Sequence, residues 1–133
     1  MAAFEFASAD LMIAYGSTLA ELFENAAYGI AAHSGFDDRQ SPLYDVAVMA
    51  IGDSPEELLG DWLVQLDIRS IEAGLSLVSF SVDRLEEGGV QGTAAGYRSS
   101  ETALSQRWDV ETIVPMVDGA WARIRKGLPQ QAS

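Results

Sequence analysis

Three carboxylates stand where they could take part in chemistry. Asp10 falls between two short expected strands, where a side chain can point out of the end of a sheet, and Asp37 and Asp38 are adjacent in a polar loop. Oxygen ligands of this kind suit hard cations such as Ca²⁺ or Mg²⁺. Their spacing matches no metal-binding loop, so a turn residue and a solvated loop are the structural alternatives. A metal-dependent hydrolase built on these three residues is the enzyme alternative.

Other catalytic arrangements find little support in the sequence. The chain has no Cys, which excludes disulfides, Cys nucleophiles and thiolate zinc sites. Its one His, His33, follows the first expected helix, where an imidazolium interacts favourably with the helix dipole. The serines show no nucleophile-elbow pattern, and Gly88 and Gly89 do not precede a helix as the glycines of a phosphate loop do. We therefore predict no catalytic residue, no cofactor-binding residue and no enzyme activity.

The charge of the chain restricts its partners. It has 20 acidic and 8 basic side chains in 133 residues, a formal net charge of −12. Residues 1–68 hold twelve of the acids and a single base, Arg39. This balance argues against direct contact with nucleic acid or with an anionic membrane surface. The acidic half favours a basic protein partner or a cation, with a solvated surface as the alternative. Arg123, Arg125 and Lys126 form a small basic cluster that we interpret as edge-strand charge.

Length and composition predict one domain over residues 1–133, with 128–133 as a loose tail. Hydrophobic residues make up 48% of the chain, enough for an ordinary core. The first ten residues lack the basic and apolar regions of a signal peptide. No stretch approaches the ~20 apolar residues that span a bilayer. A cytoplasmic location is the default expectation.

The elements that would position these residues follow from capping signals and periodicity. Thr18 and Glu21 have capping-box spacing, and apolar residues at helical spacing predict a helix that runs to about Ala32. Ser54 and Pro55 start a second helix, which should stop at Gly74. Alternation and turn residues predict strands at 4–8, 11–15, 44–51, 75–82, 90–97, 110–117 and 121–124. Late strands joined by short turns favour an α+β fold, with a largely antiparallel sheet covered on one face by two helices.

Several ordered segments resemble one protein family, the archeases. Residues 4–13 (FEFASADLMI) resemble the archease opening, typically Y-E-x-x-x-H-T-A-D-V-G-I. Residues 15–29 (YGSTLAELFENAAYG) are similar to its Y-G-x-T-L-E-E-A-F-E-N-A-A-x-G segment. Residues 56–63 (EELLGDWL) match E-E-L-L-x-x-W-L, and 71–75 (IEAGL) resemble the turn that follows. The resemblance is good over about residues 4–82 and implies the archease fold.

The resemblance also implies a function. Archeases are small acidic proteins that assist the guanylylation and turnover of RtcB-type tRNA-splicing RNA ligases and are not known as enzymes. They bind a divalent cation, commonly Ca²⁺, through the Asp of the T-A-D motif and an Asp near the C-terminus. The first ligand would be Asp10, whereas the second has no counterpart in residues 124–127 (IRKG), and Ala7 replaces the motif His. The expected partner is an RNA ligase. The alternative is a divergent protein-interaction module that keeps the fold without the metal.

Overall fold

The computed structural model describes residues 3–33, 44–98 and 108–127. Asp37, Asp38 and the expected tail at 128–133 lie outside these residues. Helices and strands begin and end close to the predicted positions. In chain order they are β1 (Phe4–Ser8), β2 (Leu11–Gly16), α1 (Leu19–His33), β3 (Tyr44–Ile51), α2 (Pro55–Ala73), β4 (Leu75–Glu86), β5 (Gly89–Arg98), β6 (Trp108–Met116) and β7 (Gly119–Lys126).

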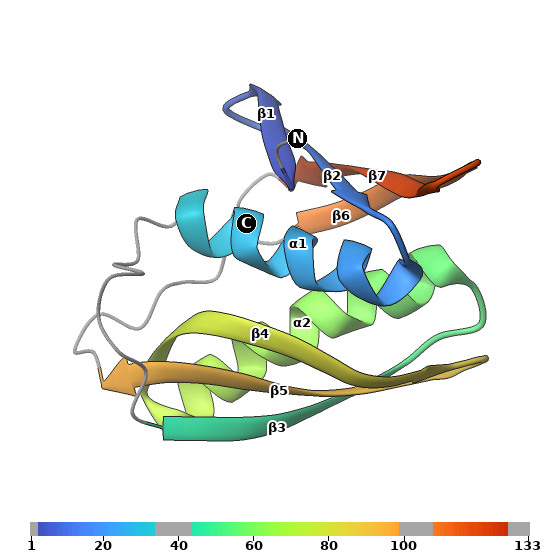
Figure 1. Ribbon diagram of the computed structural model, residues 1–133. Coiled ribbons are helices and arrows are strands. Elements are labelled where there is room, and N and C mark those ends of the chain that lie inside the picture. The colour runs from blue at the N-terminus through green and yellow to red at the C-terminus, as the bar shows by residue number, and fades with distance from the viewer. Residues whose placement is uncertain (1–2, 34–43, 99–107, 128–133) are drawn as a thin grey trace, which may run out of the picture.

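The strands form two antiparallel sheets with both helices between them (Figure 1). Sheet A has the order β1-β2-β7-β6, and sheet B has the order β3-β5-β4. The α+β class, the antiparallel pairing and the two helices are confirmed, while the single sheet is corrected to two. The reason is that β2 pairs with β7, from the other end of the chain, whereas β3 joins the β4–β5 hairpin. Alternation within a strand shows which residues are buried but not which strand lies beside it.

The predicted capping residues start both helices. Thr18 Oγ1 accepts a hydrogen bond from the Glu21 N–H at 3.1 Å, and the Glu21 carboxylate accepts from the N–H of the residue before Thr18. In α2, Ser54 Oγ accepts from the Glu57 N–H at 3.1 Å, and Glu57 in turn accepts from the residue before Ser54. Gly74 ends this helix with φ +67°, a conformation that glycine adopts without strain. Local sequence therefore fixes where the helices begin.

The core lies between the helices and the two sheets. Trp62 of α2 is fully buried, and its indole N–H donates to the Phe23 carbonyl of α1 at 3.3 Å. On the other side the ring lies against Gly92 of β5, where a Cβ would stand only 2.7 Å from Trp62 Cη2. The close packing of this large ring thus links both helices to sheet B. No helix in the described part of the chain is long and apolar enough to cross a membrane.

Helix side chains cover the backbone of three edge strands. The Tyr28 hydroxyl donates to the Phe80 carbonyl at 3.4 Å and accepts from the Phe80 N–H at 3.2 Å, on the free edge of β4. The Glu24 carboxylate accepts from the N–H of Val82, further along this edge, at 2.7 Å. Two carboxylates of α2 do the same for edge strands β3 and β6: Asp61 accepts from Ile51 N–H, and Glu56 accepts from Ile113 N–H. These contacts satisfy polar groups that an added strand would otherwise pair with.

Candidate functional site

The structure places Asp10 in the exposed turn between β1 and β2, as the sequence predicted. Its N–H donates to Ser8 Oγ at 3.2 Å, and its carbonyl accepts from the Lys126 N–H at 2.8 Å. The backbone of the turn is therefore fixed to the end of β7. The carboxylate itself forms no ion pair with any described Lys or Arg.

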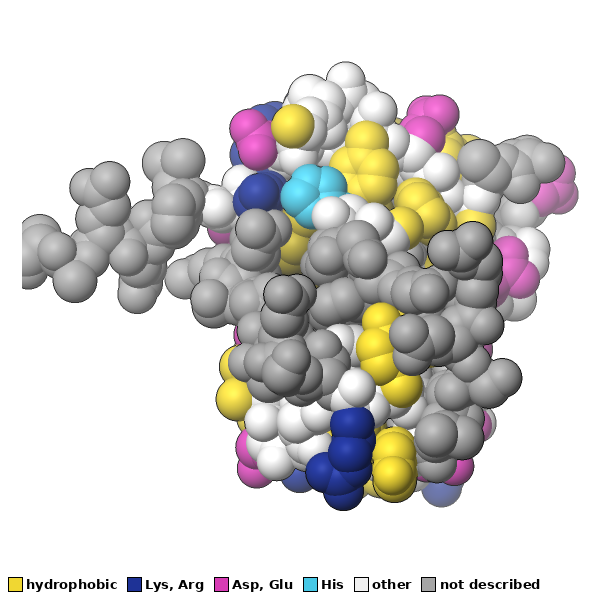
Figure 2. Space-filling model, turned by 90° about the vertical axis from the view of Figure 1, so that its left-hand side faces the viewer, with side chains coloured by type: hydrophobic (Ala, Val, Ile, Leu, Met, Phe, Trp, Pro, Cys, Tyr) yellow, Lys and Arg dark blue, Asp and Glu magenta, His cyan; other side chains and the backbone are white. Residues whose placement is uncertain are grey.

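His33, the last residue of α1, lies beside this turn. Its ring packs between Phe6 and Trp108, with a centroid distance of 5.2 Å to each ring. Its Nε2 lies 3.2 Å from the carbonyl of Ala9, the neighbour of Asp10. Figure 2 shows the His33 ring (cyan) beside hydrophobic side chains on this end of the molecule. The sequence placed His33 at the end of the helix, but its contact with the Asp10 turn depends on the tertiary fold.

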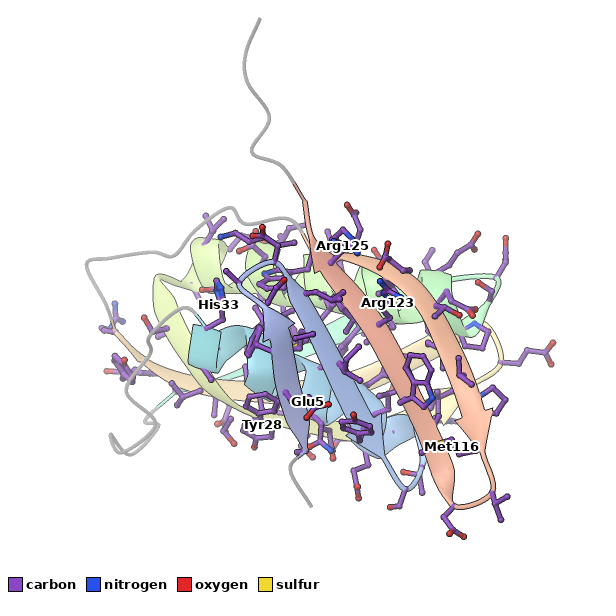
Figure 3. All side chains as sticks on the ribbon, turned by 90° about the horizontal axis from the view of Figure 1, so that it is seen from above. Glu5, Tyr28, His33, Met116, Arg123 and Arg125 are labelled. Carbon is purple, nitrogen blue, oxygen red and sulfur yellow. The ribbon has the colours of Figure 1, made fainter. Side chains whose placement is uncertain are left out.

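The basic cluster does not lie on an edge strand, which corrects the sequence interpretation. Arg123 and Arg125 project from β7, which has β2 on one side and β6 on the other. Figure 3 labels both side chains on this strand. Both form ion pairs with Glu111 of β6, with Arg123 Nε 3.0 Å from Oε1 and Arg125 Nε 3.2 Å from Oε2. A register shift between Val110 and Thr112 lets this one carboxylate reach both guanidinium groups. Because all three side chains are well exposed, the pairs contribute little to stability.

The described residues around Asp10 do not fit a divalent cation. Ca²⁺ takes about six to eight oxygen ligands, whereas the residues described here contain no group of three or more His, Cys, Asp or Glu side chains able to hold a metal. The carbonyls of Ala9 and Asp10 already lie at hydrogen-bond distance from His33 and Lys126. Asp37 and Asp38, the other candidate ligands, fall outside the described residues.

Two titratable groups, Tyr15 and Asp67, have raised pKa values. The Tyr15 hydroxyl donates to Glu5 Oε1 at 2.8 Å on the outer face of sheet A. That hydrogen bond, with partial burial and the Glu5 charge, raises the pKa of Tyr15. Burial alone raises the pKa of Asp67 on α2.

Comparison with known proteins agrees with the resemblance seen in the sequence. The family model described as the Archease protein family (MTH1598/TM1083) matches residues 4–114. The solution structure of Methanobacterium thermoautotrophicum protein 1598 matches with a TM-score of 0.66 and 26% identity, covering 96% of this chain and 100% of that one. No curated protein matches the chain. Because the family model spans most of the sequence, including the Asp10 turn and both helices, this chain belongs to the archease family.

Proposed function

We propose that this protein is a cytoplasmic accessory factor of an RtcB-type tRNA-splicing RNA ligase, which promotes guanylylation and turnover of the ligase and is not itself an enzyme. The observation that carries the proposal is the match of the archease model to residues 4–114. An accessory role also agrees with the Asp10 turn, which presents its carboxylate to a partner on the surface.

The charge of the protein supports a protein partner rather than RNA. At a formal net charge of −12 the chain repels a phosphate backbone. A ligase that binds RNA needs a basic surface, and charge complementarity would speed the encounter between the two proteins. Asp10 is the residue of this chain that we expect to act on the ligase, since it occupies the position of the family's T-A-D carboxylate.

The test is guanylylation of the ligase from the same organism, measured with and without this protein. We expect the wild type to raise the rate and Asp10→Ala to remove most of that effect. Asp45→Ala is the matched control, because Asp45 is an exposed carboxylate on β3 of the other sheet. A wild-type protein that leaves the rate unchanged would exclude this function. Equal loss in both variants would exclude a specific role for Asp10.

A second candidate is a divergent interaction module that keeps the archease fold without the metal. It is favoured by the single carboxylate at the Asp10 turn and by the absence of a metal-ligating group among the residues described. Ca²⁺ tests the second candidate. The module predicts no change in melting temperature on adding Ca²⁺. A rise of several degrees that Asp10→Asn abolishes would instead support a cation at this turn and argue against the module.

A further inference from the structure

Two adjoining hollows form a groove at the end of the molecule where both helices begin. Their volumes are about 410 Å³ and about 390 Å³, and Leu19 and Pro55 line both. The groove runs from the β6–β7 turn of sheet A to the β4–β5 turn of sheet B. Both turns lie on the right-hand side of Figure 1. We call it the helix-start groove. Its larger apolar side chains are Leu19, Pro55, Leu58, Leu85, Ile113 and Pro115.

Tightly packed backbone forms part of the groove's lining. A Cβ at Gly52 would lie 2.5 Å from the Leu58 nitrogen, so only glycine fits there. At the other end Gly119, with φ +140°, lies against the backbone of Gly16 and Ser17 with no room for a side chain. Backbone held this closely cannot relax far to fill the groove. The hollow is therefore maintained by the packing of the backbone around it.

Carboxylates surround the groove. Six acidic residues line it or neighbour its lining residues in the chain: Asp53, Glu56, Glu57, Glu86, Glu87 and Asp118. A seventh, Glu21, accepts hydrogen bonds from the lining residue Ser17. Arg84, near the end of β4, pairs with Glu86. The carboxylates of Asp53, Glu87 and Asp118 have no hydrogen-bond or ion-pair partner within the described part of the chain. They are therefore available to cations.

An anion would not suit this groove, although helix starts commonly attract one. The carboxylates of Glu21 and Glu57 already accept N–H groups just ahead of the two helices, and Glu56 accepts from the Ile113 N–H. Their charges offset the positive ends of the helix dipoles. The surroundings therefore attract a cation, whereas the apolar lining favours a side chain without charge.

We propose that the helix-start groove binds an extended basic segment of another protein, with one apolar side chain in the groove and Lys or Arg side chains beside the carboxylates. An apolar centre within a polar rim is a common arrangement at protein interfaces. The proposal goes beyond the ligase function and does not depend on it. The Asp10 turn lies at the opposite end of α1, beside its last residue, His33.

The test compares short peptides by ¹H–¹⁵N NMR titration of the full-length chain. The probe is acetyl-Lys-Arg-Leu-Arg-Lys-amide, and the controls replace its Leu with Ser or its four basic residues with Glu. We expect the probe to shift amides of the groove, to bind at least about threefold more tightly than the Ser peptide, and to weaken with added salt. No binding, shifts centred elsewhere, or equal affinity for the Ser peptide would each overturn the proposal.

Matched variants separate the groove from overall charge. The variant Asp53→Asn/Glu87→Gln removes two carboxylates beside the groove, while Asp45→Asn/Glu72→Gln removes the same charge from β3 and from the end of α2. We expect the first pair to weaken probe binding at least about fivefold and the second less than twofold. Similar weakening by both pairs would mean attraction by net charge alone and would overturn the proposal. These exposed side chains lie outside the core, so both variants should remain folded.

Discussion

At the scale of single residues, Asp67 is a carboxylate whose ionised form is destabilised by partial burial in the folded protein. It lies half-buried on α2, and this burial raises its pKa. A raised pKa means that the native state binds a proton more readily than the unfolded chain. Above the native pKa both states are ionised and the native state bears the desolvation cost. As the pH falls through the native pKa towards the ordinary aspartate value, protonation of the native state removes that cost.

We therefore predict that Asp67→Asn raises the melting temperature at pH 7. The gain in the free energy of unfolding should stay below about 1 kcal/mol, because water still screens a half-exposed group. The difference from the wild type should shrink as the pH is lowered to about 4, close to the ordinary pKa of aspartate. Thermal denaturation at several pH values measures this. Asp45→Asn on the exposed face of β3 should show no such trend, and an equal gain in that variant would refute the explanation.

The sequence predicted the position of Asp10 but not the contacts that other residues make around it. Asp10 was placed correctly in a turn, because the strands around it are marked by local alternation. The packing of His33 against that turn was not foreseen, since it arises only when the end of α1 meets β1 and β6. The ion pairs of Glu111 with Arg123 and Arg125 were not predicted either, because they depend on a register shift that no sequence pattern showed.

At the scale of elements, both helices serve as covers for sheet edges. Tyr28 and Glu24 are four residues apart on α1, off its apolar stripe, and both reach the backbone of β4. The spacing i, i+4 puts them on the same flank of the helix. That polar pair was visible in the sequence, but a polar flank ordinarily faces water. Because β4 lies beside this flank, the two side chains instead form hydrogen bonds with the backbone of that strand.

Removing one of these covers should weaken the protein. In Tyr28→Phe the N–H and carbonyl of Phe80 lose their partner at a partly exposed edge, where losing a hydrogen bond costs about 0.5–1.5 kcal/mol. We expect a loss in this range in urea denaturation, together with more aggregation at high protein concentration as the edge of β4 opens. Tyr44→Phe is the control, because Tyr44 is exposed on β3. Equal losses in the two variants would show that the edge contact is not the cause.

Capping residues and turns could be predicted where one short segment contains the whole signal. Both helix starts, the stop at Gly74 and the β6–β7 hairpin around Gly119 are of this kind. The assignment of strands to sheets is not, because β2 and β7 lie at opposite ends of the chain. Such a pairing is decided by the packing of all the elements together. The sequence therefore led to one sheet, whereas the strands divide into two.

At the scale of the whole molecule, the helices join the two sheets into one body. Each helix packs against both sheets: α1 contacts β2 and β4, and α2 contacts β3 and β6. A partly unfolded state in which one sheet had separated would expose the buried flank of both helices, at about 25 cal/mol per Å² of apolar surface. Sheet A also brings together the two ends of the chain through β2 and β7. Neither sheet should therefore unfold alone.

We predict a single unfolding transition, which the positions of the tryptophans make testable. In Trp62→Phe the remaining tryptophans, Trp108 and Trp121, both belong to sheet A. Their fluorescence then reports sheet A, whereas far-UV circular dichroism reports both sheets and both helices. The two signals should give the same midpoint in urea even if the substitution lowers it, since two-state unfolding makes all probes coincide. A fluorescence midpoint clearly apart from the dichroism midpoint would mean that sheet A separates first or last. In that case, the packing of the helices against both sheets would not be enough to make the two sheets unfold together.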